Sequence, residues 1–213
     1  MQRPTRVALG LLGSLTLSFA PAARAQDEGV KRVEQLVKSA GSTVQAISEA
    51  KLQFVKTIDV YNSILADGAK DRKKLYKKLQ SEMESTQEKR AEVGRRADQM
   101  RLEAGIVFKS WADSAVGIAN PDLRKRSEER LEKTKDRCAE IQSAGRSAVE
   151  VYEPVMKALQ DQVTYLGHDL NAEAVTSLKP DAAKLNAEAQ ELTKRVDEAI
   201  GIANTNINAL RPQ

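Results

Sequence analysis

One apolar stripe runs without a break through LEKTKDRCAEIQSAGRSAVEVYEPVMKALQDQVTYL, residues 131–166. Its members are Leu131, Thr134, Cys138, Ile141, Gly145, Ala148, Tyr152, Val155, Leu159, Val163 and Leu166. They recur about every 3.5 residues, which predicts a long helix that buries a narrow seam against other helices. The stripe keeps its phase through Pro154. We therefore expect this proline to kink the helix, or to mark a change from three helices to four, rather than to end it.

The same periodicity continues outward along the chain. The stripe extends back to Leu123, and three further stripes cover residues 29–66, 69–119 and 181–210. The breaks fall where glycine follows a helix, and where proline follows an asparagine that caps the next one. No segment alternates β-branched with polar residues, and short connections make neighbouring helices antiparallel. The sequence therefore predicts an all-α fold, an elongated antiparallel helical bundle or coiled coil of about four helices, with the third helix kinked at Pro154.

Residues 1–25 have the composition of a secretory signal peptide. Arg3 and Arg6 give a positive start, residues 7–20 form a short apolar stretch, and Ala23-Arg24-Ala25 is a small-x-small cleavage site. The apolar stretch is too short for a stable membrane-spanning helix. An uncut N-terminal anchor is the alternative. We expect cleavage near Ala25, a helical bundle domain at residues 26–213 without a transmembrane segment, and a periplasmic location.

Composition argues against several functional classes. The formal net charge falls from +4 to +1 when the leader arginines (Arg3, Arg6 and Arg24) are removed, so the charge balance gives nucleic-acid binding no support. The sequence lacks a phosphate-binding glycine loop, a nucleophile elbow and the paired histidines of a metalloprotease. One histidine and one cysteine cannot build the usual metal sites. We expect no enzyme activity, catalytic residue, metal or cofactor.

The single cysteine, Cys138, lies on the predicted buried stripe between Thr134 and Ile141. An exported protein that depends on disulfides normally carries an even number of cysteines. We therefore expect a buried structural thiol. A disulfide between two chains is the alternative.

Polar residues around the end of the stripe form a candidate interaction patch. Its members are Asp161, Tyr165, His168, Asp169, Asn171 and Glu173. Spacings of four and three residues place Asp161, Tyr165 and His168 on one helical face. Because histidine titrates near neutrality, the patch would be a proton-sensitive recognition surface. The alternative, which we prefer for the histidine itself, is that His168 satisfies helix-end carbonyls beside Gly167.

A dense basic stretch forms a candidate anionic-surface patch. Its members are Lys70, Arg72, Lys73, Lys74, Lys77 and Lys78, which flank Leu75 and Tyr76. Positive charge at the start of a helix is mildly unfavourable to the helix dipole, so this placement suggests contact with anionic headgroups or a cell-wall polymer. The alternative is a solvated helix face at the end of the bundle.

Two further sets of residues carry a family resemblance. Asn120–Ser127 lead into Leu131 and Thr134, and the second set is Pro154-Val155, Leu159, Asp161-Gln162-Val163, Leu166, His168, Leu170-Asn171-Ala172, Ala174 and Ser177-Leu178. With residues 108–111 they resemble a family of exported, helical bacterial proteins known as a domain of unknown function (DUF2959-like). The resemblance covers nearly the whole mature chain and implies a Gram-negative, periplasmic, all-helical protein with no assigned activity. The chain departs from the family pattern at Gly167, Thr164 and Cys138, which argues against a basic side chain at that helix end.

These observations favour a non-enzymatic periplasmic coiled-coil interaction or scaffolding protein. Its partner would be another protein or a second copy of itself. The alternatives are a chaperone-like binder of unfolded exported clients and a protein that binds the envelope surface, by contact with membrane or cell wall. The sequence identifies neither the partner nor the oligomeric state.

Overall fold

The computed structural model describes residues 20–211, with side chains described from Gly29 onward. Over this range the chain forms α1 (Ala20–Leu65), α2 (Arg72–Val116), α3 (Pro121–His168), α4 (Ala172–Ser177) and α5 (Lys179–Leu210). No strand occurs within these residues, so the predicted all-α fold is confirmed. The predicted leader lies outside the described residues except for residues 20–25, which begin α1.

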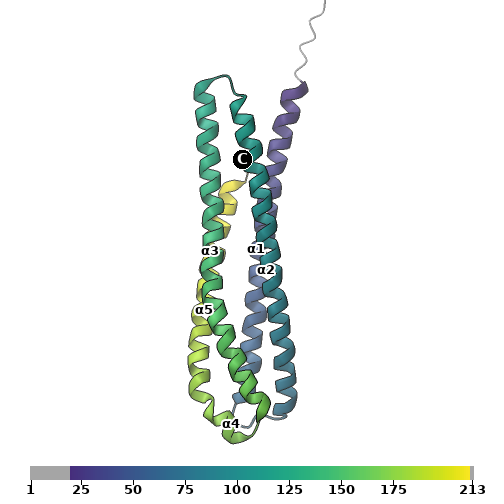
Figure 1. Ribbon diagram of the computed structural model, residues 1–213, viewed down its shortest axis with the longest axis vertical. Coiled ribbons are helices and arrows are strands. Elements are labelled where there is room, and N and C mark those ends of the chain that lie inside the picture. The colour runs from purple at the N-terminus through teal and green to yellow at the C-terminus, as the bar shows by residue number, and fades with distance from the viewer. Residues whose placement is uncertain (1–19, 212–213) are drawn as a thin grey trace, which may run out of the picture.

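The four long helices form a closed up-down-up-down bundle (Figure 1). α1 packs most extensively on α2, and α3 packs most extensively on α5. Further contacts between α1 and α5 and between α2 and α3 close the ring. We call the end with the α1–α2 turn and α4 the tip, at the bottom of Figure 1, and the end with the α2–α3 turn the far end. Short turns place each helix antiparallel to the next, as predicted.

α5 is shorter than its neighbours, so the far end of the bundle has only three helices. The guanidinium of Arg137 donates to the carbonyl of Ala209 at 3.0 Å, which places the end of α5 beside this part of α3. α3 continues through Pro154, and Figure 1 shows α3 bending in its green part. The end of α5 lies beside Arg137, which precedes Pro154 by seventeen residues on α3, so Pro154 lies within the four-helix region. The hypothesis that it marks the change from three helices to four is therefore wrong.

Local capping explains where α2 and α3 begin. Asp71 has a left-handed backbone with φ of 51°, and its side chain accepts a hydrogen bond from the amide of Lys74 at 3.1 Å. α2 therefore starts at Arg72, three residues later than predicted. The side chain of Asn120 accepts from the amides of Asp122 and Leu123 at 2.9 and 3.1 Å, with Pro121 at the first helical position. This start agrees with the prediction.

The core divides into three parts along the bundle. The tip core contains large side chains, among them Phe54, Tyr61, Leu79, Leu159 and Leu185. The far core contains Leu36, Met100, Cys138, Ile141 and Ile207. Between them lies the waist, where the buried residues are Ala144, Ala148 and Ala199. The predicted stripes thus supply most of the core.

Two predicted stripe positions are exposed at the far end. Leu123 is 53% exposed and Val30 is 39% exposed. Leu123 lies in the first turn of α3, beyond the end of α5, whereas Val30 lines a cavity at the end of α5 together with Leu210 and Arg211. Both positions are exposed because α5 ends here and does not cover them.

Candidate interaction site at the tip of the bundle

The tip is held together by contacts between its two turns. Lys179, the first residue of α5, forms an ion pair with Asp67 of the α1–α2 turn at 2.7 Å. This contact, mainly through its hydrogen bond, lowers the pKa of the Asp67 carboxyl. The pair is exposed, so it orients the turns more than it stabilises the fold.

Buried polar side chains fix the register of the helices beneath the tip. Tyr61 of α1 is fully buried and donates a hydrogen bond to the side-chain carbonyl of Gln162 in α3. Burial also raises the pKa of its hydroxyl. The amides of Asn62 in α1 and Asn186 in α5 exchange two hydrogen bonds of 2.9 Å each. Directional bonds of this kind favour one register of the seam over its alternatives.

The junction of α3 and α4 is a turn built by two residues of the predicted interaction patch. One carboxylate oxygen of Asp169 accepts from the backbone amide of Asn171 at 2.9 Å, and the other accepts from its side-chain amide at 2.7 Å. The side-chain carbonyl of Asn171 then caps α4 by accepting from the amide of Ala174 at 2.8 Å. Asp169 and Asn171 therefore shape this surface, and α4 is a short helix that the periodicity did not predict.

Tyr165 joins α3 to α4 at the edge of the same patch. Its hydroxyl lies 3.1 Å from the hydroxyl of Ser177, which donates to the carbonyl of Ala174 at 2.8 Å. Tyr165 is nevertheless 46% exposed. An aromatic ring held by a hydrogen bond and open to solvent can serve as a contact anchor for a partner.

The remaining members of the patch, Asp161, His168 and Glu173, are exposed. Among the described residues, none of the three side chains has a hydrogen-bond or ion-pair partner. The expectation that His168 satisfies helix-end carbonyls is therefore wrong. His168 lies in the last turn of α3 and is exposed.

The basic stretch lies at the start of α2, on the same end of the bundle. Lys70, Lys73, Lys74, Lys77 and Lys78 are exposed, and none forms an ion pair with another described residue. Arg72 differs, because its guanidinium is half-buried and donates to the carbonyls of Ile64 and Ala66 at 3.1 and 3.3 Å. Arg72 therefore caps α1 rather than contributing a free charge.

The structure brings the two predicted patches together at one contact. A Cβ atom added at Gly167 of α3 would lie 2.5 Å from the hydroxyl oxygen of Tyr76 in α2. Tyr76, in the middle of the basic stretch, thus packs against the last turn of α3, next to His168. The sequence signal for this contact is Gly167, at a position where the family resemblance predicts a lysine. Only a residue without a side chain leaves room for the tyrosine.

Residues 20–211 include no group of three or more histidine, cysteine, aspartate or glutamate residues placed to hold a metal ion. No helix among them is long and apolar enough to cross a membrane. Cys138 lies in the far core with 1% of its surface exposed, and burial raises the pKa of its thiol to about 11. The predicted burial of this cysteine is confirmed.

Comparisons with known proteins give one result. The family model described as "Protein of unknown function (DUF2959)" matches residues 23–210, which is nearly the whole chain. Neither the curated proteins nor the solved structures include a match. The match extends over all five helices, including both halves of the tip. The chain therefore belongs to the DUF2959 family of proteins of unknown function.

Proposed function

We propose that this protein is an exported, non-enzymatic interaction protein that binds a protein partner in the periplasm through its tip. The observation that carries the proposal is the position of the two patches. Separated by about ninety residues in sequence, they meet at one end of the bundle through Tyr76 and Gly167. The leader-like composition of residues 1–25 supports export.

The charges of the tip support recognition of a partner in one orientation. Asp161 and Glu173 give an acidic edge, and the lysines at the start of α2 give a basic edge. Charges without partners of their own are free to pair with a second protein, and complementary charge mainly sets specificity and association rate. Tyr165 lies with the acidic edge and supplies apolar contact area.

The rigidity of the tip supports the same proposal. The buried bonds of Tyr61 and Asn62, and the Asp169–Asn171 turn, hold the surface before any partner arrives. Binding to a surface that is already ordered loses less conformational entropy than binding to a mobile one.

The test is photo-crosslinking in living cells. Photoreactive residues replace Asp161, Glu173 and Lys77 at the tip, with a control at Glu129, an exposed and unpaired acid near the far end. A discrete product formed only by the tip probes, with another protein or with a second copy, is the expected result. Equal labelling of many exported proteins from the tip and from Glu129 would contradict it and favour the chaperone-like alternative.

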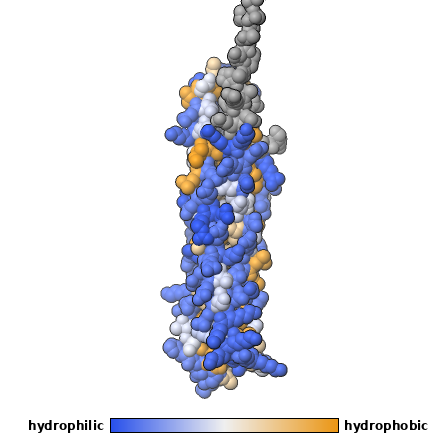
Figure 2. All heavy atoms as spheres, turned by 90° about the vertical axis from the view of Figure 1, so that its right-hand side faces the viewer, coloured by the Kyte–Doolittle hydropathy of each residue, from blue (hydrophilic) through white to orange (hydrophobic). Residues whose placement is uncertain are grey.

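The surface gives the chaperone-like alternative limited support. Exposed apolar residues occur as separate groups, such as Leu52 with Val55 on α1 and Leu102 with Ile106 on α2. Figure 2 shows orange groups scattered over a mostly hydrophilic face. A holder of unfolded clients needs a larger continuous apolar area.

A second candidate function is binding to an anionic surface of the envelope. The five exposed lysines without ion pairs favour it, because each such charge near an anionic membrane contributes about 1 kcal/mol. The test is binding to vesicles of anionic phospholipid, using the K73E/K74E/K77E/K78E variant. The matched control makes the same charge change at the far end, in K109E/K125E/R126E/K133E. Binding lost only in the tip variant would support this function, and equal loss in both variants would contradict it.

A further inference from the structure

The waist of the bundle encloses a cavity of about 510 Å³. Its wall contains residues from α1, α2, α3 and α5, and it lies between the tip core and the far core. Small residues make this space, because Gly94 and Ala97 of α2 face Gly145 and Ala148 of α3 across it. A Cβ atom added at Gly94 or Gly145 would meet no atom within 4 Å. The volume falls within the range of natural ligand pockets.

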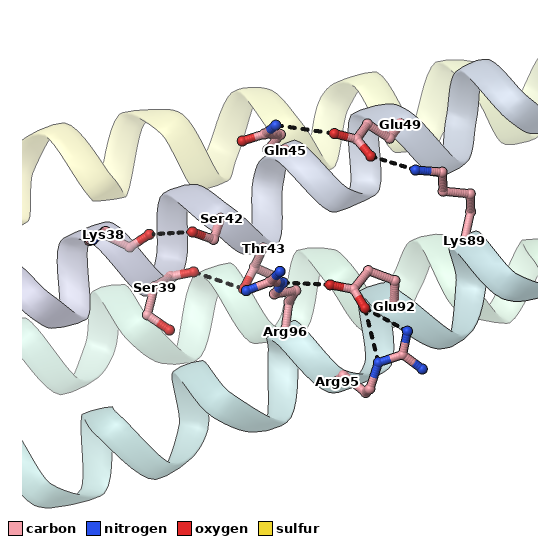
Figure 3. Close-up of polar contacts among 10 residues, drawn as sticks. All are labelled: Lys38, Ser39, Ser42, Thr43, Gln45, Glu49, Lys89, Glu92, Arg95 and Arg96. Atoms are coloured by element: carbon pink, nitrogen blue, oxygen red, sulfur yellow. Dashed lines mark hydrogen bonds and ion pairs between the residues drawn. The ribbon is translucent and has the colours of Figure 1, made fainter.

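The mouth of the cavity lies between α2 and α3. Its exposed wall residues are Arg90, Gly94 and Arg101 on α2 and Arg146 and Val149 on α3. Ion pairs bridge two of the other seams at this level. Lys89 of α2 pairs with Glu49 of α1 at 2.7 Å, as Figure 3 shows, and Lys51 of α1 pairs with Asp197 of α5 at 2.6 Å. A ligand would therefore enter between α2 and α3.

The interior of the cavity is mostly apolar. Its floor is formed by Val44, Ile47, Phe54, Met100, Leu192 and Val196. Along α1 the wall runs from Thr43 to Phe54, a distance of eleven helical steps, or about 16 Å at 1.5 Å per residue. Thr43 already donates its hydroxyl to the carbonyl of Ser39 at 3.0 Å, so it adds no free donor to the floor. This elongated apolar space suits an unbranched hydrocarbon chain.

Three arginines line the mouth. Arg90 pairs with Glu153 and Arg101 with Asp98, but Arg146 has no ion-pair partner among the described residues. Glu150 lies one turn from Arg146 on the same face of α3 without forming an ion pair with it, so the guanidinium of Arg146 is available to a ligand. Arginine binds carboxylates well because its planar fork of N–H donors matches their geometry.

One buried donor in the wall also lacks a partner. The hydroxyl of Tyr152 is buried and forms no hydrogen bond, and the guanidinium carbon of Arg90 lies 6.0 Å from the centre of its ring. Burial raises the pKa of this hydroxyl to about 12, so it is a donor at neutral pH. A buried donor without an acceptor is unfavourable, and an acceptor on a ligand would relieve that cost.

We propose that the waist binds one single-chain amphiphile with a carboxylate head, of the free fatty-acid class. The hydrocarbon chain occupies the cavity between the two cores. The carboxylate lies at the mouth between α2 and α3, where it pairs with Arg146 and Arg90 and accepts from the Tyr152 hydroxyl. A single chain fits because the space is one elongated cavity lined by all four long helices. This activity is independent of partner binding at the tip.

The test is titration with dodecanoate below its micelle concentration, followed by calorimetry and native mass spectrometry. Dodecyltrimethylammonium, with the same chain and the opposite charge, is the ligand control. We expect one dodecanoate per chain and binding of the cation at least about tenfold weaker. Absence of dodecanoate binding, or equal binding of the two amphiphiles, would overturn the proposal.

Substitutions in the cavity and at its mouth test where dodecanoate binds. Gly145→Leu fills the cavity and should weaken dodecanoate binding at least about tenfold, whereas Gly105→Leu, at an exposed helical glycine with equal free space, should leave it unchanged. Circular dichroism verifies that both variants fold. Arg146→Glu, at an exposed and unpaired position, tests the mouth without filling the cavity, and Tyr152→Phe removes only the donor. Retained affinity in both Gly145→Leu and Arg146→Glu would overturn the proposal.

Discussion

The tip core and the waist are built on the same four helices and the same heptad seam, yet one is filled and the other is hollow. In the tip core the seam carries Tyr61, Leu159 and Leu185. At the waist it carries Ala144, Ala148 and Ala199. Helix periodicity decides which positions face inward, but the volume of the side chains decides whether the interior closes. One repeat can therefore build a rigid support and a container in a single bundle.

The polar contacts that join the helices also differ between the two regions. In the tip half, by which we mean the part of the bundle between the waist and the tip, hydrogen bonds inside the bundle join the helices. The hydroxyls of Thr57 and Thr86 are 2.8 Å apart, and the side chains of Asn62 and Asn186 are hydrogen-bonded to each other. At the waist the helices are joined at the surface, by ion pairs such as Lys51–Asp197. Exposed ion pairs contribute little to stability, so we expect the waist to deform more easily than the tip half.

The largest expected effect comes from removing volume in the tip core. Leu159 is completely buried, so Leu159→Ala should lower the free energy of unfolding by about 2–5 kcal/mol, because it leaves a cavity in a packed region. Urea denaturation followed by circular dichroism measures this change. At the waist, Val196→Ala removes side-chain volume beside an existing cavity and should cost less. An equal loss in the two variants would contradict the contrast between the regions.

A glycine substitution at the tip should also destabilise the fold. Gly167→Ala places a Cβ 2.5 Å from the Tyr76 hydroxyl oxygen, and we expect a net loss of about 1 kcal/mol in the free energy of unfolding. Tyr76→Phe removes that oxygen, and the next ring atom is at an ordinary contact distance of 3.4 Å. In the Tyr76→Phe background the loss should therefore disappear. If Gly167→Ala costs the same in both backgrounds, Tyr76 does not pack against this turn.

The same substitution at the waist should have the opposite sign. Gly145→Ala adds a methyl group that meets no atom within 4 Å, and alanine is the better helix former. We expect the free energy of unfolding to rise by about 0.5–1 kcal/mol. Thermal and urea denaturation both report this gain. A loss of stability would show that the waist is closed at this position.

The smallest expected effect is on how the free energy of unfolding depends on pH, through Glu82 in the tip half. Hydrogen bonds from Gln53 at 2.8 Å and from Lys56 at 2.9 Å lower the pKa of Glu82, which is buried in α2. A glutamate with a folded-state pKa below the unfolded value of about 4.3 stabilises the fold at neutral pH. This stabilisation is lost as the pH falls through the folded-state value.

Glu82→Gln should therefore lower the free energy of unfolding at pH 7, and the difference from the wild type should shrink at pH 3. Urea denaturation at the two pH values measures the change. Glu92→Gln, at a half-exposed acid that pairs with Arg95 and Arg96 on its own helix, is the control and should show a smaller difference. A Glu82→Gln difference that does not depend on pH would contradict the assigned bonds.

Periodicity predicted the long helices, the breaks between them, most of the core and the burial of Cys138. It did not predict α4, because six residues are too few to show a helical period, and this helix depends on the Asn171 cap. It placed Leu123 in the core because a repeat does not reveal where a neighbouring helix ends. Gly145 is a member of the predicted stripe, and the small volume of this residue is the signal that could have revealed the cavity.

The candidate site was predicted as two separate patches, and only the tertiary structure joins them. Composition identified the basic stretch, but it could not separate Arg72, which caps α1, from the lysines without partners. Spacing put Asp169 and Asn171 in a recognition patch, whereas their side chains bond to each other and to α4. The contact of Tyr76 with Gly167 joins residues that are distant in sequence, so no local pattern predicts it.

Methyl NMR under xenon pressure tests most directly whether the waist is hollow while the tip core is filled. Xenon enters dry apolar cavities and shifts the signals of the methyl groups that line them. We predict shifts for Val93, Val196 and Ala199 at the waist, and none for Leu159, Val163 and Leu185 in the tip core. Equal shifts in the two groups, or no shift at the waist, would contradict the division of the bundle into a filled tip and a hollow waist.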